Sequence, residues 1–253
     1  MPRPQTLIPW LDEQTPLPPA HTAQGKDSSL HGLVAAGGEL SVSRLLEAYG
    51  QGIFPWYSEG QPILWWSTDP RMVLQVSDFK LHRSLKKTLQ KFIASPDSEI
   101  RFNTAFEQVI GRCATTDREG QPGTWIVSDM RAAYIQLHRA GHAHSVETWV
   151  DNQLVGGLYC VAMGRAVFGE SMFAHQTDAS KIALAALVAF ARVHDIQWID
   201  CQQNTKHLAS LGAREIPRSQ FVEGVKRDQQ LKGPTWAFES SYWRALVATK
   251  EHA

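Results

Sequence analysis

The chain has 253 residues, 43% of them hydrophobic, so it is long enough to bury a full core as one large domain or as a large and a small one. Its 25 basic residues balance its 25 acidic ones, which argues against a protein that grips nucleic acid with its whole surface and leaves that work to local patches. The sequence has no apolar run of about 18 residues to span a membrane and no signal-peptide core near its start, so we expect a cytoplasmic protein.

The sequence offers few groups for a metal or a disulfide. Cys113, Cys160 and Cys201 lie far apart without any C-x-x-C pair, so neither a disulfide framework nor a zinc knuckle is expected. His142 and His144 are two residues apart, and even with Cys201 they lack a third ligand at metal-binding spacing. We expect reduced thiols, no metal and no tightly bound cofactor.

Residues 1–70 predict an N-terminal arm and a small α/β domain. Residues 1–30 are rich in Pro, Thr, Gln and Ser without periodicity, which is typical of an extended arm with little structure of its own. A short helix follows, capped by Ser41 and ended by Gly50 and Gly52. Pro55 then marks a turn, and residues 63–66 predict a strand.

Residues 71–253 predict a larger domain, so that the whole chain belongs to the α+β class. Its first predicted elements are a strand at 71–76, a basic helix at 79–92, a helix at 103–113 capped by Asn103 and a helix at 128–140. Short turns then join strands at 143–150, 153–163 and 165–173, and such turns make antiparallel hairpins. Asp178 caps an almost wholly apolar helix at 179–193, which we expect to be buried, and a strand at 196–201 follows.

This order of three antiparallel strands, a buried helix and a further strand resembles the acyltransferase fold of the GNAT enzymes. We therefore predict a GNAT-like acyltransferase domain with a mixed, mainly antiparallel sheet. An acetyl-CoA enzyme of that fold needs a loop with Arg or Gln in first place, Gly in fourth and Gly or Ala in sixth, to bind pyrophosphate. Residues 138–143 begin with His and residues 153–158 end in Leu, so both fail. The acyl donor must come activated by another carrier, and an aminoacyl ester on tRNA is one.

Two segments carry side chains that suit chemistry on such a donor. Residues 52–67 place Trp56, Trp65 and Trp66 within eleven positions, and flat rings at that density suit stacking on a nucleobase. Further on, two apolar runs at residues 169–173 and 199–202 contain the polar residues Glu170, Asp200 and Gln202. A carboxylate in an apolar run is costly unless it has a partner or a role.

Asp200 and Gln202 are two apart on a predicted strand, so both side chains should leave the same face. An Asp at that position can orient a Gln amide or hold an incoming ammonium group. The alternative is that Asp200 only ends the strand and caps the next turn.

These segments, together with GGELSVSRLLEAYGQGIFPWYS, GHAHSVETW, LVGGLY, DASK and HLASLGA, resemble the leucyl/phenylalanyl-tRNA–protein transferase family in the same order along the chain. The resemblance runs from about residue 33 to about residue 221. It implies transfer of leucine, phenylalanine and, less well, methionine from aminoacyl-tRNA to the N-terminal α-amino group of proteins that start with Arg or Lys, which creates an N-degron.

The resemblance also implies roles for individual residues. Glu170, Asp200 and Gln202 would be catalytic, and two carboxylates also favour a cationic acceptor. The 3′ adenosine of the tRNA would contact Trp56, Trp125 and Tyr134. The aminoacyl side chain would occupy an apolar pocket, although for each member taken alone plain core is the simpler interpretation: Leu158, Val167, Met172, Leu184, Leu187 and Ile199.

The predicted basic helix carries one cationic face that suits the tRNA backbone, formed by Lys80, Arg83, Lys87 and Lys91. An ordinary solvated helix face is the alternative.

Three departures from the family pattern stand out. Asp178 replaces Asn, Cys160 replaces Gly, and Leu187 and Ala191 stand where some relatives carry Phe. The last difference leaves the preference between Leu and Phe open. A small-molecule acyltransferase of the same fold and a tRNA-binding module remain the rival functions.

Overall fold

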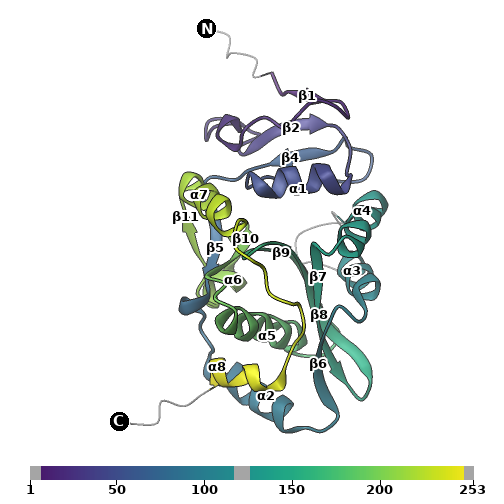
Figure 1. Cartoon of the computed structure of the whole chain (residues 1–253), viewed down its shortest axis with the longest axis vertical. Helices are drawn as coiled ribbons and strands as arrows, with labels where there is room; N and C mark the ends of the chain where they lie inside the picture. Colours follow the sequence, from purple (N-terminus) through teal and green to yellow (C-terminus); the bar gives the residue numbers. More distant parts are fainter. Residues whose placement is uncertain (1–6, 117–125, 248–253) are drawn as a thin grey trace.

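The structure is a computed structural model that describes residues 7–116 and 126–247, and it contains two β-sheets (Figure 1). The smaller sheet has four strands in the order β1-β2-β4-β3. β1 runs parallel to β2, whereas the other neighbours are antiparallel. This sheet and the helices beside it comprise β1 (Trp10–Leu11), η1 (Ala20–Thr22), β2 (Leu33–Gly37), α1 (Val42–Gly50), β3 (Phe54–Pro55) and β4 (Leu64–Trp66).

The N-terminal arm is less independent than its composition predicts. It has little regular structure beyond β1 and η1, but Leu11 and Leu17 are buried in the core. Polar contacts fasten it as well, since the backbone N–H of Leu17 donates to Glu47 on α1 at 2.8 Å. The arm lacks periodicity because it packs as an irregular strap over the small sheet and its helix.

The predicted start of α1 is confirmed. The Ser41 hydroxyl accepts a hydrogen bond from the backbone N–H of Arg44 at 3.2 Å, as an N-cap does. The apolar side of α1 buries Leu45, Ala48 and Tyr49.

The larger sheet has seven strands in the order β11-β5-β10-β9-β8-β7-β6. Its neighbours are antiparallel except for β9 and β10, which are parallel, so the predicted mixed, mainly antiparallel sheet is confirmed. The strands are β5 (Arg71–Gln75), β6 (Ser98–Phe102), β7 (Ala143–Val150), β8 (Gln153–Met163), β9 (Ala166–Ala174), β10 (Trp198–Gln202) and β11 (Arg214–Ile216).

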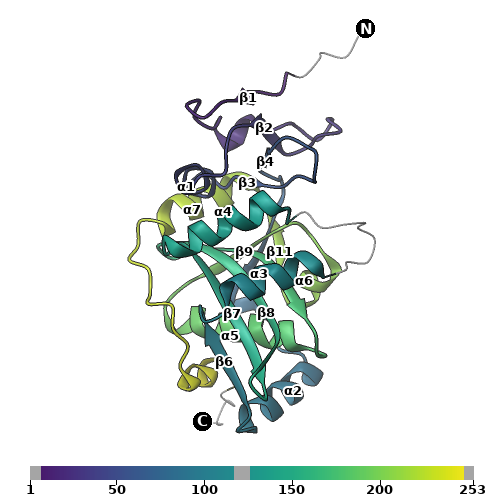
Figure 2. The same cartoon turned by 90° about the vertical axis from the view of Figure 1, so that its right-hand side faces the viewer.

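Helices cover both faces of this sheet (Figure 2). The alternation along β8 shows the two faces, because Tyr159 packs in the core shared with α3 and α4 while Leu158 packs in the core shared with α5. The helices are α2 (Arg83–Ala94), α3 (Phe106–Thr115), α4 (Ser128–Arg139), α5 (Ala179–Val193), α6 (Lys206–Ser210), α7 (Arg218–Asp228) and α8 (Arg244–Val247), with short 3-10 turns η2 (Val76–Asp78) and η3 (Ser240–Trp243). None of the described helices is long and apolar enough to cross a membrane.

The start of α5 lies close against β8, which explains the glycine at position 156 of that strand. A Cβ on Gly156 would lie 2.5 Å from the Cβ of Ala179, so only glycine fits there. As predicted, α5 is buried, and it ends at Val193.

Three predicted details of the helices are wrong. The basic helix begins at Arg83, not at 79, because η2 comes first and the backbone N–H of Lys80 donates to the carbonyl of Leu211 instead. Asn103 does not cap α3; it has a left-handed backbone, and its side-chain oxygen accepts the N–H of Ser145 across the sheet. Asp178 stands before α5 but makes no capping bond, since its carboxylate binds Lys181 at 2.7 Å.

Candidate functional site

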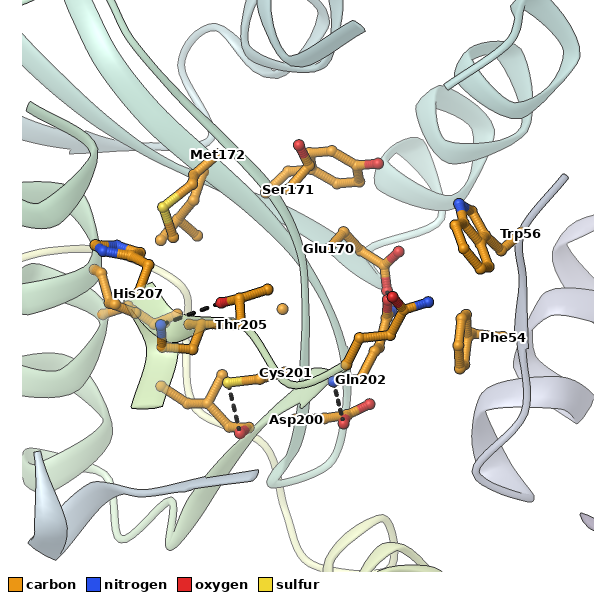
Figure 3. A pocket seen from close by; sticks show the side chains of 18 of the residues that line it. Phe54, Trp56, Glu170, Ser171, Met172, Asp200, Cys201, Gln202, Thr205 and His207 are labelled. Atoms are coloured by element: carbon orange, nitrogen blue, oxygen red, sulfur yellow. Dashed lines mark hydrogen bonds between the residues drawn. The ribbon is translucent and has the colours of Figure 1, made fainter. Parts of the chain in front are cut away.

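A pocket of about 290 Å³ lies between β3 of the small sheet and the parallel strands β9 and β10 of the large one (Figure 3). Helices α5 and α6 close its other side. Residues far apart in the sequence line it: Phe54, Pro55, Trp56, Leu158, Tyr159, Gly169, Glu170, Ser171, Met172, Leu184, Leu187, Ile199, Asp200, Cys201, Gln202, Gln203, Thr205, His207 and Leu208.

Most of the predicted apolar wall is present. Five of the six residues named for it line the pocket: Leu158, Met172, Leu184, Leu187 and Ile199. Val167 does not line it; it is wholly buried in the core on the α5 side of the sheet, opposite Ile199 in the β9–β10 register. Ala191 is also wholly buried and away from the lining, so only Leu187 of the two departures on α5 faces the pocket.

An aromatic edge faces the polar side of the pocket. Trp56 is partly exposed there, and the indole N–H of Trp66 donates to its carbonyl at 2.7 Å. Trp65, in contrast, is wholly buried and donates to the carbonyl of Gly37, so it holds the small sheet together. Trp125 lies outside the described residues.

Glu170, on β9, is the centre of a hydrogen-bond network inside the pocket. Its Oε1 accepts from the hydroxyl of Tyr49 at 2.7 Å and from the side-chain amide of Gln202 at 3.0 Å. Its Oε2 accepts from the hydroxyl of Tyr134 at 3.2 Å. The two tyrosine hydroxyls also lie within hydrogen-bond distance of each other, so two hydroxyl protons are shared among three contacts.

The Glu170 carboxyl is basic for its type. Burial raises its pKa to about 7, and the charge of Asp200 adds to the rise, while the hydrogen bonds from Tyr49, Tyr134 and Gln202 act against it. Burial also raises the pKa values of both tyrosines, so they remain protonated donors.

The expectation for Tyr134 is not met. Its ring is wholly buried at the α4 side of the sheet and its hydroxyl is occupied by Tyr49 and Glu170, so no face is open to an adenine. Sequence reasoning missed Tyr49 altogether, since a Tyr on the apolar face of α1 reads as core. A buried tyrosine hydroxyl needs a hydrogen-bond partner, and this requirement could have indicated that Tyr49 contacts a polar group.

Asp200 forms a buried ion pair with Arg71. The Nε and Nη2 of Arg71 lie 2.8 and 2.6 Å from the two carboxylate oxygens, and neither side chain has any exposed surface. The rings of Phe54 and Phe221 lie against the guanidinium, with centroids 4.7 and 4.5 Å from its carbon. An incoming ammonium group therefore cannot reach Asp200. Arg71 was missed, although an Arg inside an apolar strand needs a buried partner as much as Asp200 does.

A β-bulge lies between Asp200 and Gln202 on β10. The register of β10 against β5 shifts between them, and Gln202 has a left-handed backbone with φ of 59°. The expected same-face spacing therefore fails. The backbone N–H of Gln202 donates to Asp200 at 2.9 Å, and its carbonyl accepts from the hydroxyl of Thr68 at 3.1 Å, so the bulge is fixed while the side chain reaches Glu170.

The basic residues of the α2 region stand outside the pocket. Arg83, Lys87 and Lys91 are exposed on α2, and Lys80 is exposed before its start. The ring of His82 bonds to the carbonyl of Ser210 at 2.7 Å. This contact places the start of α2 against α6, whose His207 and Leu208 line the pocket.

Cys201 and His144, two of the residues considered for a metal site, have different surroundings. Cys201 is the bulged residue and lines the pocket, but burial raises the pKa of its thiol to about 12, which keeps it protonated. His144 is stacked on Trp236 with ring centroids 4.1 Å apart. Within residues 7–116 and 126–247, no group of three His, Cys, Asp or Glu side chains is arranged to hold a metal ion.

Solved structures offer only a distant likeness. A functionally unknown conserved protein from Staphylococcus epidermidis aligns over 73% of this chain and 68% of its own, with 10% identity and a TM-score of 0.35, which is too low to assign the fold.

Known sequences, in contrast, match the chain along nearly its whole length. The family described as leucyl/phenylalanyl-tRNA protein transferase matches residues 73–226, and its N-terminal domain matches residues 38–69. Proteins named leucyl/phenylalanyl-tRNA–protein transferase are similar to it in Leptothrix cholodnii, 60% identical over 95% of both chains, and in Polaromonas sp., 59% identical over 99% of this chain and 97% of the other. Because these matches include both sheets and every described wall of the pocket, the chain belongs to the leucyl/phenylalanyl-tRNA–protein transferase family.

Proposed function

We propose that the protein transfers leucine or phenylalanine from aminoacyl-tRNA to the N-terminal α-amino group of an acceptor protein. The observation that carries this proposal is a single pocket with an apolar end and a polar edge. Leu158, Leu184 and Leu187 offer only apolar contact to the donor side chain, while Glu170 and Gln202 face the same space. A pocket of this kind binds an apolar amino acid and leaves its ester beside polar groups.

The residue roles follow from this placement. Trp56 stacks on the 3′ adenosine of the tRNA, an interaction worth about 1–3 kcal/mol per base. Glu170 and Gln202 contact the reacting groups. Asp200 supports Gln202 by accepting a hydrogen bond from the backbone N–H of Gln202. Aminolysis of an activated ester needs little more than orientation and proton transfer, because an α-amino group has a pKa near about 8.

Several finer features belong to the same proposal. Methionine is a third, weaker donor. Acceptor proteins start with Arg or Lys, because Glu170, the carboxylate in the pocket that has no cationic partner among the described residues, favours a cationic group. Addition of Leu or Phe to such proteins creates an N-degron. Since aminoacyl-tRNA is a cytoplasmic substrate, we place the protein in the cytoplasm.

We also propose that residues 71–253 form a GNAT-like domain and residues 1–70 a separate small one. In support, three antiparallel strands, the buried helix α5 and the parallel pairing of β9 with β10 occur in the expected order. The chain passes from one sheet to the other between Trp66 and Arg71.

A transfer assay tests the proposal. Radiolabelled Leu-tRNA is incubated with the protein and a peptide that starts with Arg, and the product is a labelled peptide one residue longer. The matched controls are the same peptide with an acetylated N-terminus and an otherwise identical peptide that starts with Glu. Label transferred from acetyl-CoA would favour the small-molecule acyltransferase, and tRNA binding without any product would favour a tRNA-binding module.

A further inference from the structure

The two carboxylates at the pocket differ in what they can do with a proton. Asp200 is bound by two guanidinium nitrogens of Arg71 and by the backbone N–H of Gln202, and it has no exposed surface. A proton on Asp200 would break a buried ion pair and leave Arg71 uncompensated, which is costly. Asp200 is therefore a poor proton acceptor and a good anchor for the bulge.

Glu170 has the opposite surroundings. It is partly exposed to the pocket, and its hydrogen-bond partners among the described residues are the neutral donors Tyr49, Tyr134 and Gln202. Neutral donors orient a carboxylate without cancelling its charge. The other charged group that acts on it is Asp200 on β10, whose charge is already paired. The Cys160 thiol on β8 is a nearby titratable group, and its pKa is raised by burial and by the charge of Glu170, so it stays neutral.

The two tyrosines come from separate elements and converge on this one carboxylate. Tyr49 is on α1, beside the small sheet, and Tyr134 is on α4. Both rings are wholly buried, so their hydroxyls are held in place and the hydroxyl–hydroxyl bond couples them. Glu170 also lines the pocket and is partly exposed there, so its carboxylate can accept a further hydrogen bond from a bound group.

We propose that Glu170 accepts the proton of the attacking α-amino group, and that Tyr49 and Tyr134 are positioning residues that aim its carboxylate into the pocket. This inference rests on the proposed aminoacyl transfer. It assigns the proton-transfer step to Glu170 and leaves Asp200 with the task of holding Gln202.

The step balances as follows. The amine nitrogen attacks the ester carbonyl and forms the new C–N bond, and its proton passes to the Glu170 carboxylate. The C–O bond to the ribose then breaks, and the protonated Glu170 returns the proton to the departing ribose oxygen. The products are an amide and a free hydroxyl, no proton is gained or lost overall, and Glu170 is again ionised.

The test is the pH dependence of the single-turnover rate with saturating Leu-tRNA and an Arg-starting peptide. Wild-type activity should rise with pH as Glu170 ionises, since its pKa is raised to about 7 by burial. Tyr49→Phe removes a donor that stabilises the ionised form, so the rising limb should move to higher pH while the rate near pH 9 returns to within about threefold of wild type. Glu170→Gln should lower the rate at pH 8 by at least about 100-fold.

Tyr242→Phe is the matched control, because it removes the hydroxyl of a tyrosine in η3, whose ring lies among Phe190, His194 and Phe238, and it leaves the Glu170 network intact. Its profile should coincide with that of wild type. The ionisation of the peptide amine, near about pH 8, is common to all variants and cannot produce a difference between them.

If the rising limb of the pH–rate profile stays in place in Tyr49→Phe, the inference is overturned. An equal loss of rate at every pH also overturns it, because a purely structural tyrosine would give that result. A Glu170→Gln rate within threefold of wild type also overturns it. If Glu170→Gln does not fold, the position of the limb in Tyr49→Phe decides alone. Absence of product from wild-type protein with both Leu-tRNA and Phe-tRNA refutes the proposed function itself, and is thereby distinct from the failure of this inference.

Discussion

Arg71 and Asp200 illustrate how a single buried ion pair sets the chemistry of its neighbours. The pair joins β5 to β10, and a further nitrogen of Arg71 lies 3.3 Å from the carbonyl of Gly52, just before β3 of the small sheet. Replacing such a pair by apolar residues can be neutral, whereas removing one partner leaves a buried charge alone. The pair therefore acts as a fixed support for the Gln202 bulge.

Asp200→Asn should lower the free energy of unfolding by about 3–5 kcal/mol, because the buried Arg71 keeps its charge without a carboxylate to pair it. Chemical denaturation measures the loss. Arg139→Ala is the control, since its ion pair with Glu107 is exposed, at 61% and 57% of the two side chains, and should be worth less than about 1 kcal/mol. Equal stability of Asp200→Asn and wild type would show that the pair does not support the fold.

Glu170→Gln should make the protein more stable at pH 8 but not at pH 4. The folded-state pKa of Glu170 is raised to about 7 from an ordinary value of 4.5, so between these two pH values the folded protein keeps a proton that the unfolded chain has lost. Stability therefore falls as pH rises through this window, and an uncharged Gln avoids the loss, which is about 1–3 kcal/mol. The check is Tm against pH for both proteins, and two parallel curves would contradict it.

Leu187→Phe should shift donor preference from Phe-tRNA toward Leu-tRNA by about tenfold. The larger side chain shortens the apolar end of the pocket, and a phenyl ring needs more depth than an isobutyl group. Competition between the two charged tRNAs measures the ratio. Val193→Phe, an exposed position on the same helix, should leave it unchanged. A fixed ratio in Leu187→Phe would mean that this side chain does not set the depth of the pocket.

At the scale of elements, α2 and α6 extend the site beyond the pocket. The contacts of His82 and Lys80 with residues 210 and 211 bind the start of α2 to the C-terminal end of α6. The exposed cations that follow on α2 are thereby held beside the α6 wall. This position suits the phosphates of a tRNA whose 3′ end enters the pocket.

Reversing Arg83 and Lys87 to Glu should weaken Leu-tRNA binding and reduce the slope of log affinity against log salt by about one unit per lost phosphate contact. The measurement is a binding titration at several salt concentrations. A charge-matched control reverses Lys226 and Lys232, which are exposed elsewhere, and should keep the slope. An unaltered slope in the α2 variant would make this helix an ordinary solvated face.

At the scale of the whole molecule, one hydrophobic core spans both sheets. It contains Leu45 and Tyr49 from α1, beside the small sheet, together with Tyr159 and Phe168 from the large sheet. The pocket lies across the same boundary, with Phe54 and Trp56 on one side and β9 and β10 on the other. Neither part has a complete site by itself.

The protein should accordingly unfold in one cooperative transition, because the shared core and the buried Arg71 couple the two sheets. Calorimetry should give equal calorimetric and van't Hoff enthalpies, and tryptophan fluorescence should follow far-UV circular dichroism. Two separate transitions would show that the domains are energetically independent.

Much of the fold was accessible from local patterns. The Ser41 cap, the hairpin strands β7 and β8, the buried helix α5 and most of the apolar pocket wall could be predicted, because each depends on residues a few positions apart or on a repeat of 2 or 3.6 residues. The order of the family's motifs sufficed for the family assignment. The predicted starts of α2 and α3 were wrong, because hydrogen bonds with residues 211 and 145 compete with helix formation at these positions.

The sequence by itself determined that the chain is an α+β protein of this family with Glu170, Asp200 and Gln202 at positions that call for chemistry. Only the tertiary structure decided which partner each of the three side chains has. Asp200 meets Arg71 from 129 positions away, and Glu170 meets Tyr49 from 121 positions away. The charge of a carboxylate and its affinity for a proton depend on its neighbours in space, and such neighbours leave no local pattern in the sequence.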